Sequence, residues 1–519
     1  MRRSLQEQIT QIIDEGKGHS RSIIVQMETG EKEADELLVA ASQAVKRRGM
    51  LLMARGALPP PRSELKKIGI EARKRKSKAR RTTSAGLLSM ASAAAEIGFG
   101  AGLPGIQKNA ATHIAHLLAS TFVRQAMASD AERRKKAIPK HSDITKLWSS
   151  ASVVMNVSKD DLANLPKQVS GIRGIFPNRS VSIPPIMEIS PQQLPESVKD
   201  NKTSTWGLEV IGALAVWGAY GVEGQGVKVA VLDTGMDPNH PDLAGRMATA
   251  DWAEFGPGGN RIPNSTPRDS AKHGTHCCGI VAGGGNSGRW IGVAPAAALA
   301  AGMVLPGGGG TDAQILAGLE WAIGRGVDVI SMSLGGLQLG PEVLDIYTRT
   351  MIRANQAGIP VVVAIGNEGS QTSGSPGNDY FALTIGATDS EDRAAGFSGG
   401  RTQVVMESDF VADKYLPLVY SKPDLAAPGV AVKSCVPGNE YAVWNGTSMA
   451  APHVAGALAL LLSATNIKQD VPANERAYVL QDLLLGSVEE LGEAGQDHRF
   501  GLGRMNILRT IGNAIELGY

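Results

Sequence analysis

The chain has 519 residues, of which 43% are hydrophobic and 20% are charged, as is typical of a soluble globular protein with two or three domains. Its three cysteines exclude a disulfide framework, and the weakly apolar run 85–104 carries polar residues and several glycines, which argues against a membrane span. The net charge is only +2, but residues 1–200 hold 32 Lys and Arg against 19 Asp and Glu, whereas residues 201–519 hold 20 against 31. Opposite charges favour docking of the two parts, and solvated surfaces that merely differ in charge are the alternative.

The first 19 residues predict an N-terminal helix, because Leu5, Ile9 and Ile12 recur at helical spacing. This segment has an arginine pair but lacks the continuous apolar stretch of an export signal. We therefore expect a cytoplasmic protein, and secretion by a leaderless route stays open.

Residues 20–181 predict a first domain in which strands and helices alternate. The pattern is β-α-β-β-α-β, with elements expected at 21–28, 31–49, 50–57, 150–158, 159–169 and 171–181. This order is that of ferredoxin-like α+β domains, with an insertion of residues 58–148 between the second and third strands.

The insertion at 58–148 opens with a basic run, residues 66–81, and continues as an alanine-rich helical stretch to residue 128. Such a run is most often a solvated helix face. No aromatic residues are interleaved with it, so nucleic acid is disfavoured as a partner. We expect a regulatory protein to bind the insertion instead.

Residues 182–203, rich in Pro and Ser, predict a linker, and the pattern changes from residue 204 to 519. Apolar strands that end in Gly, Asp or Asn alternate there with helices; the strands are expected at 226–235, 297–305, 327–336, 359–367 and 380–389, and helices at 313–326 and 343–358. This pattern predicts an α/β domain with a parallel, doubly wound sheet. Polar residues at the carboxyl ends of such strands usually carry the chemistry.

Three polar residues stand out at such positions. Asp233 ends a strand, His273 opens a glycine-rich helix, and Ser448 opens a long apolar helix in which Pro452 is expected in the first turn. Each has a structural reading by itself, as a turn cap, a core histidine or a helix N-cap. A serine nucleophile needs a base, and the base needs a group that fixes its tautomer, so the three together predict a catalytic triad.

The strings around these residues resemble the three active-site signatures of the subtilisin-like serine proteases. They read "VAVLDTGMDPNHPDL", "HGTHCCGIVAG" and "NGTSMAAPHVAG", and the resemblance extends to "SMSLGG", "AIGNEG", "KPDLAAPG" and "RFGLGRMN". It covers most of residues 203–519. It implies a subtilisin-like sheet domain and serine endopeptidase activity.

The resemblance implies a role for each residue. Ser448 is expected to attack the scissile carbonyl, His273 to act as base and then as acid, and Asp233 to orient the imidazole. Asn367 is expected to donate its side-chain N–H to the oxyanion, with the backbone N–H of Ser448 as a second donor. This chemistry requires no cofactor.

The resemblance also implies that protein or peptide substrates bind as an added strand. The substrate is expected to pair with Ser333, Leu334 and Gly335 on one side and with Gly308 and Gly309 on the other.

The first specificity pocket is expected between residues 333–336 and 364–366, including Gly366, with its floor near Gly374. Glycine leaves room there, so we expect a broad or apolar preference before the cut. Glu368 at the rim is expected to admit basic residues as well.

Asp242 and Asn286 form a candidate calcium site. These residues match positions that bind calcium in many family members, together with the carbonyls of Gly284, Gly288 and Trp290, and all-oxygen ligation suits Ca²⁺. The glycines of this loop depart from the family pattern, so structural calcium stays open.

Two other ligands are argued against. His273 and Cys277 lie four residues apart, as zinc ligands can, but there is no second ligand pair with the proper spacing. The string "GGGNSG" fits a dinucleotide fingerprint but follows a helix rather than a strand.

The first domain resembles the propeptides of the same family, most clearly in "NVSKDDLANLPKQVSGIRGIFPNRSV". The resemblance implies a zymogen whose propeptide binds the catalytic domain and passes its tail through the active site, with processing between Val181 and Trp206. Two rival functions remain: a catalytically silent peptide-binding protein, and a nucleic-acid-binding protein that uses the basic run 66–81.

Overall fold

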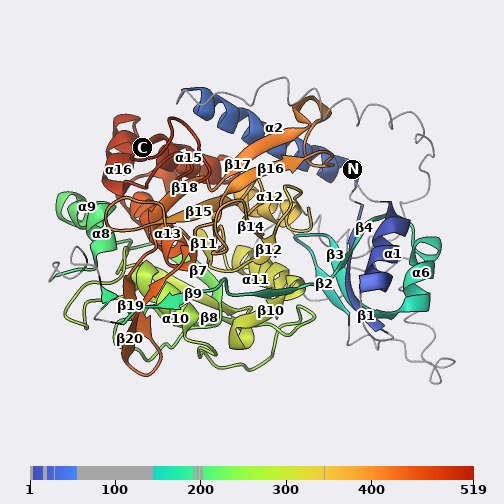
Figure 1. Ribbon diagram of the computed structural model, residues 1–519, viewed down its shortest axis with the longest axis horizontal. Coiled ribbons are helices and arrows are strands. Elements are labelled where there is room, and N and C mark those ends of the chain that lie inside the picture. The colour runs from blue at the N-terminus through green and yellow to red at the C-terminus, as the bar shows by residue number, and fades with distance from the viewer. Residues whose placement is uncertain are drawn as a thin grey trace. The chain divides into compact units, whose positions relative to one another are not determined.

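The computed structural model describes residues 4–15, 20–28, 30–54, 144–190, 193, 194, 198, 203–343 and 345–519 (Figure 1). The chain divides into two compact units. The first takes the described residues of 1–39, 59–179 and 405–418, and the second those of 40–58, 180–404 and 419–519. The basic run and the alanine-rich stretch of the insertion lie outside the described residues.

The first unit is built on a four-stranded sheet with the order β2-β3-β1-β4 and antiparallel neighbours. Its strands are β1 (Ser20–Met27), β2 (Thr145–Leu147), β3 (Ser152–Ser158) and β4 (Ile172–Pro177). Helices α1 (Leu5–Glu15) and α6 (Lys159–Gln168) supply Ile9 and Leu162 to a core shared with Ile23 and Val153 of the sheet. Ser158 caps α6 by accepting the N–H of Asp161, which fixes where this helix begins.

The strand predicted at 50–57 is wrong, because residues 50–54 continue helix α2 (Glu31–Ala54). Residues 50–54 read "MLLMA", which contains no β-branched residue and only strong helix formers. The second strand in chain order is instead β2, which directly precedes β3 and lies at the edge of the sheet. The first part of α2, up to Val39, belongs to the first unit, and its last part belongs to the second.

The second unit contains a seven-stranded sheet in which all neighbours are parallel. The strands in sheet order are β18 (Leu425–Pro428), β15 (Leu383–Thr388), β13 (Val361–Ala364), β11 (Val329–Met332), β7 (Lys228–Asp233), β9 (Ala298–Met303) and β8 (Met247–Glu254). The α/β class and the five predicted strands of this sheet are confirmed.

Helices cover both faces of the parallel sheet (Figure 1). Val229 and Val231 of β7 belong to the core formed with α10 (His273–Ala282) and α13 (Thr447–Ala464), whereas Leu232 lies against Gly318 of α11 (Asp312–Gly324). Successive side chains of a strand point to opposite faces, so α10 and α13 lie on one face and α11 on the other. Helix α12 (Thr348–Gln356) contacts both α11 and β13.

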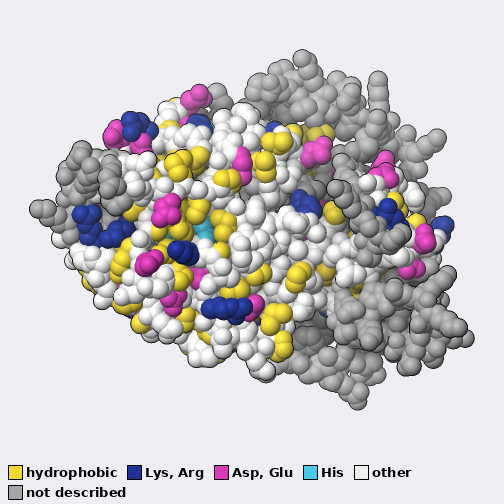
Figure 2. Space-filling model, turned by 60° about the horizontal axis from the view of Figure 1, so that its bottom comes forward, with side chains coloured by type: hydrophobic (Ala, Val, Ile, Leu, Met, Phe, Trp, Pro, Cys, Tyr) yellow, Lys and Arg dark blue, Asp and Glu magenta, His cyan; other side chains and the backbone are white. Residues whose placement is uncertain are grey.

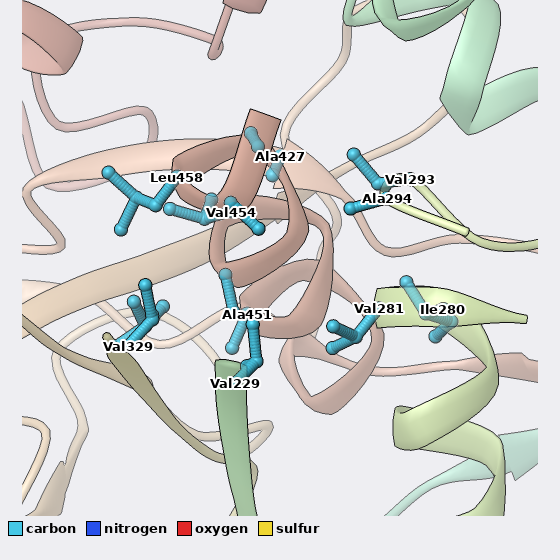
Figure 3. Close-up of a cluster of buried hydrophobic side chains, with 14 of the residues drawn as sticks. Val229, Ile280, Val281, Val293, Ala294, Val329, Ala427, Ala451, Val454 and Leu458 are labelled. Atoms are coloured by element: carbon cyan, nitrogen blue, oxygen red, sulfur yellow. The ribbon is translucent and has the colours of Figure 1, made fainter. Parts of the chain in front are cut away.

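Helix α13 is the centre of the core. Figure 3 shows Ala451, Val454 and Leu458 of this helix among side chains from the sheet and α10, such as Val229 and Val281. By length and composition α13 could cross a membrane, but 89% of it is buried inside the structure, as expected for a core helix. Its rigid packing holds the residues at its N-terminus in place.

Candidate active site

Asp233 and His273 form a buried pair at the carboxyl end of β7. The Oδ1 atom of Asp233 lies 2.7 Å from Nδ1 of His273, and it also accepts the N–H of Thr234 at 2.7 Å. A proton held at Nδ1 leaves Nε2 of the neutral ring free to act as a base. Within the described part of the chain, Nε2 of His273 and Oδ2 of Asp233 have no hydrogen-bond partner.

The electrostatic surroundings of His273 favour its charged form. Burial lowers the pKa of His273, but the Asp233 carboxylate and then Cys277 raise it, and the result lies well above the ordinary value. The Sγ atom of Cys277 is 3.9 Å from Nδ1, and burial raises the pKa of this thiol to about 11. The ring of Trp444 is stacked on that of His273, with 6.1 Å between centroids.

Ser448 is the second residue of α13 and is fully buried. Its Oγ atom lies 3.4 Å from the carbonyl oxygen of Ser333, the acceptor of its hydrogen bond. The structure therefore brings Asp233 and His273 into direct contact, while the Ser448 hydroxyl is turned toward Ser333 instead of Nε2 of His273.

Pro452 is not in the first turn of α13, as the sequence predicted, but is the sixth residue of the helix. A proline at this position has no N–H for the carbonyl of Ser448, four residues earlier. That carbonyl accepts the hydroxyl of Ser333 at 2.8 Å and the thiol of Cys277 at 3.5 Å instead. Pro452 thus frees a backbone acceptor that fixes Ser333 and Cys277 beside the serine.

Asn367, which follows β13, is held by Thr447. The Oδ1 atom of Asn367 accepts the backbone N–H of Thr447 at 2.8 Å and its hydroxyl at 2.7 Å. This arrangement directs Nδ2 of Asn367 away from Thr447, and Nδ2 donates to the carbonyl oxygen of Pro185 at 2.8 Å. A Cβ at Gly446 would lie 3.1 Å from Nδ2, so a glycine there allows the close approach. Sequence reasoning missed Thr447, whose only signal is its place before Ser448.

The predicted substrate-binding edges are occupied by the chain's own residues 180–188. Strand β5 (Ser180–Ser182) pairs antiparallel with β10 (Gly309–Thr311), and the N–H of Ile183 donates to the carbonyl of Gly308 at 3.1 Å. On the other side, the N–H of Gly335 donates to the carbonyl of Ser182 at 3.3 Å. The 180–188 segment, which begins with strand β5, therefore lies between the two edges expected for a substrate.

Farther along, β6 (Met187–Glu188) pairs antiparallel with Trp444 and Asn445 of β20 (Glu440–Asn445). The prediction that residues 182–203 form a linker is thus wrong in part, because Ser182, Met187 and Glu188 are in strands. Between β5 and β6 stand Pro184 and Pro185, which have no N–H to offer an edge strand.

The residues predicted to form the specificity pocket lie together. Strands β12 (Gly336–Gln338) and β14 (Ser373–Ser375) pair, and a Cβ at Gly335 would lie 3.4 Å from the Cα of Gly374. Leu334, between Ser333 and Gly335, is fully buried.

Gly366 has φ of +115°, and a Cβ there would lie 2.8 Å from a carboxylate oxygen of Glu368. That oxygen accepts the backbone N–H of Asn367 at 2.9 Å. Glu368 thus stands beside the glycine-lined region, with part of its carboxylate engaged by the backbone.

The buried Asp242 lies beside the exposed Asn286 in a second cluster. The Oδ1 atom of Asp242 accepts the backbone N–H of Asn286 at 2.8 Å and its side-chain amide at 3.0 Å, and Oδ2 accepts the hydroxyl of Tyr441 at 2.6 Å. A carboxylate offers about four acceptor positions, so room for a further ligand remains. Among the described residues, no Lys or Arg forms an ion pair with this buried carboxylate. The carbonyls of Gly284 and Trp290 accept the N–H groups of Ile291 at 3.2 Å and of Thr205 at 2.9 Å. A carbonyl oxygen has a second lone pair, so these oxygens and Asp242 are compatible with a hard cation such as Ca²⁺.

Comparisons with known proteins agree on one family. The model of the subtilase family matches residues 224–503. Subtilisin NAT from Bacillus subtilis subsp. natto is 39% identical over 265 residues, which cover 50% of this chain and 61% of that protein. A subtilisin from Bacillus pumilus is 38% identical over 50% of this chain and 84% of its own length. An intracellular serine protease from Paenibacillus polymyxa is 38% identical over 272 residues, which are 50% of this chain and 73% of its own length.

The chain spans about 61% of the length of subtilisin NAT and of subtilisin E from Bacillus subtilis. The matched region contains Asp233, His273, Asn367 and Ser448, which are the residues assembled at the carboxyl edge of the parallel sheet. The family model alone covers more than half of the 519 residues. This chain belongs to the subtilase family, a family of serine endopeptidases.

Proposed function

We propose that this protein is a serine endopeptidase that cleaves protein or peptide substrates and uses Ser448 as its nucleophile. The observation that carries the proposal is the hydrogen bond from Nδ2 of Asn367 to the carbonyl oxygen of Pro185. This bond supports the proposal because Asn367 donates to a peptide carbonyl of the 180–188 segment, which lies between the two edges expected for a substrate. The buried Asp233–His273 pair stands in the same unit, with one ring nitrogen open.

In the proposed mechanism, the hydroxyl of Ser448 turns from the carbonyl of Ser333 to Nε2 of His273. His273 takes the proton as Ser448 attacks the substrate carbonyl, and Asp233 stabilises the resulting imidazolium. The raised pKa of His273 supports this step, because it reflects the preference of the site for the charged ring. His273 then returns the proton to the leaving amine.

Asn367 is the proposed oxyanion donor, together with the backbone N–H of Ser448 at the start of α13. Thr447 holds the amide of Asn367 before the substrate arrives, so little reorganisation is needed when charge develops. A single donor of this kind contributes about 3–4 kcal/mol to lowering the barrier.

We also propose that the chain is a zymogen. The first unit is proposed to be a ferredoxin-like propeptide, which its sheet order of β2-β3-β1-β4 supports. The 180–188 segment is its inhibitory tail, with processing between Val181 and Trp206. The tail is a poor substrate where it meets Asn367, because the residues there are Pro184 and Pro185, and neither can donate an N–H to the carbonyl of Ser333.

The substrate preference is proposed to be broad or apolar before the cut. The glycines at 335, 366 and 374 line one region and occupy little volume.

A regulatory protein is proposed to bind the insertion at 58–148. Calcium is proposed to bind Asp242 and Asn286 and to stabilise the loop between residues 283 and 290, with no part in the chemistry.

The test is covalent labelling with an organofluorophosphonate. The probe is expected to label the wild-type chain or, if the 180–188 segment excludes it, the variant Ile183→Pro, which loses the hydrogen bond to Gly308. Label is lost in Ser448→Ala and kept in Ser463→Ala, a serine farther along the same helix. A chain that carries no label in either form, yet binds peptides, would be the silent binding protein.

A further inference from the structure

The two compact units do not follow the order of the chain. Residues 40–54, the last part of α2, belong to the second unit, although they come from the proposed propeptide. Residues 405–418, which come from the catalytic part of the chain, belong to the first unit. Each unit therefore contains a segment from the part of the chain that forms most of the other unit.

The last part of α2 is fixed in the second unit by a buried ion pair. The guanidinium of Arg48 bonds to Oδ1 of Asp424, and both side chains are buried. Asp424 also accepts Nζ of Lys422 at 2.9 Å and the N–H of Thr384 at 2.8 Å. Burial raises the pKa of Asp424, but Arg48 and then Lys422 outweigh it, so the pKa lies below its usual value. Asp424 is thus charged and matched by Arg48.

Apolar packing adds to this attachment. Leu51 and Leu52 pack against the main hydrophobic core of the second unit, and Leu51 lies 3.9 Å from the Cβ position of Gly486. Gly486 ends α15 (Ala473–Gly486), which also carries Asp482. Arg47 pairs with Asp482 at 3.0 Å, but both side chains are about one third exposed, so this pair contributes little.

The segment 405–418 is fixed in the first unit by Arg173 of β4. It connects β16 (Arg401–Val405) with β17 (Leu418–Lys422), which form a two-stranded sheet. The Nε atom of Arg173 lies 2.8 Å from a carboxylate oxygen of Asp409, and its guanidinium lies over the ring of Phe410 at 4.3 Å. Another nitrogen of Arg173 donates to Gln26 of β1 at 2.6 Å. Phe410 is only 4% exposed, so this contact is part of the packing of the first unit.

We propose that this exchange of segments makes the N-terminal unit a permanent part of the protein, which stays bound after the chain is cut between the units. A cut between residues 189 and 203 breaks neither attachment. Separation would have to withdraw Arg48, Leu51 and Leu52 from one unit and Phe410 from the other. Two independent attachments must then open together, so the fragment leaves slowly even when one opens for a moment.

The proposal goes beyond the proposed peptidase activity and does not depend on it. The test uses the full chain with Ser448→Ala and a recognition site for an unrelated, site-specific protease between Asp200 and Asn201. After cutting, the dissociation constant of the two fragments is measured from their masses under native conditions over a dilution series. We expect them to remain a 1:1 complex.

The variant Arg48→Ala is expected to raise the dissociation constant on the order of 10- to 100-fold, as for a hydrogen bond to a charged group. Phe410→Ala is expected to raise it by roughly tenfold or more, and it tests the other attachment if Arg48→Ala does not fold. Arg47→Ala is the matched control, with a change below about threefold.

Ile183→Pro separates these attachments from the 180–188 segment, because it weakens the segment without touching Arg48 or Phe410. The fragments are expected to stay together in this variant. Fragments that separate in the wild-type sequence, release caused by Ile183→Pro alone, or equal affinities for Arg47→Ala, Arg48→Ala and Phe410→Ala would each overturn the proposal.

Discussion

The second unit contains two buried His–Asp clusters that differ in how their hydrogen-bonding groups are satisfied. In one, Nδ1 of His273 lies 2.7 Å from Asp233, while Nε2 of the ring and the second carboxylate oxygen have no partner among the described residues. In the other, Nδ1 of His240 accepts the backbone N–H of Asp242 at 3.2 Å, and Nε2 lies 3.2 Å from the carbonyl of Glu440.

The difference teaches what marks a reactive site in this fold. A buried polar atom without a partner costs free energy, so a site that keeps one needs a reason to do so. The rings of His276 and His453 also lie in the core, but neither ring has a carboxylate partner within the described residues. An open ring nitrogen combined with a carboxylate at the opposite nitrogen distinguishes His273.

The largest expected effect comes from exchanging the carboxylates of the two clusters for amides. Asp233→Asn is expected to lower kcat by about 10⁴-fold, because the amide no longer fixes the tautomer or stabilises the imidazolium. The matched variant Asp242→Asn is expected to leave kcat within about threefold and to act on stability instead. Peptide hydrolysis by the processed protein and its thermal unfolding measure the two effects.

Equal losses of kcat in both variants would mean that the two clusters do not differ in function. A loss of stability in Asp233→Asn as large as in Asp242→Asn would contradict the expectation that only the Asp242 cluster acts mainly on stability.

The sequence predicted the parallel sheet of the second unit well because its signals are local. Each buried parallel strand is an apolar run, and Asp233 and Asn367 follow such runs directly, so position in the chain already places them at the carboxyl edge of the sheet. The spacing could not show that the Ser448 hydroxyl would turn to Ser333. It also could not show that Pro452, whose missing N–H frees the carbonyl of Ser448 one turn earlier, would make that carbonyl an acceptor for the Ser333 hydroxyl.

The first unit was predicted less well because its pairing is not local. The run "MLLMA" is apolar enough for a strand, although it contains only strong helix formers, and Leu51 packs as part of helix α2 against the core of the second unit. The strand character of the 180–188 segment likewise comes from Gly308 and Gly335, more than 100 residues away in the chain. No periodicity within the segment itself signals this pairing.

A third buried imidazole tests whether the carboxylate, and not burial, sets the charge of His273. Burial and then the neighbouring His273 lower the pKa of His276 to about 3, although both rings are stacked with Trp444. In the unfolded chain a histidine has a pKa of about 6.5. Below that pH only the unfolded state binds this proton, so His276 costs stability as the pH falls from 6.5 toward 3.

The variant His276→Gln removes this proton and keeps a side-chain donor for the carbonyl of Ala442. In the Ser448→Ala background, its free energy of unfolding is expected to fall less steeply between pH 6.5 and 4, by about 1.4 kcal/mol per pH unit. His273 has the opposite sign, since its raised pKa adds stability that is lost as the pH rises through that value. Urea unfolding at several pH values measures the slopes, and identical slopes for variant and parent would refute the assignment.

The smallest expected effect concerns the Asp242 cluster and its proposed calcium. A ligand at ten times its dissociation constant stabilises the folded state by about 1.4 kcal/mol, so adding EGTA to the calcium-loaded protein is expected to lower Tm by a few degrees. In Asp242→Asn, which loses a charged ligand, EGTA is expected to leave Tm unchanged. If EGTA also leaves the wild-type Tm unchanged, Tyr441 and Asn286 satisfy Asp242 without a metal. The two clusters then differ only in which hydrogen-bonding atoms have no partner.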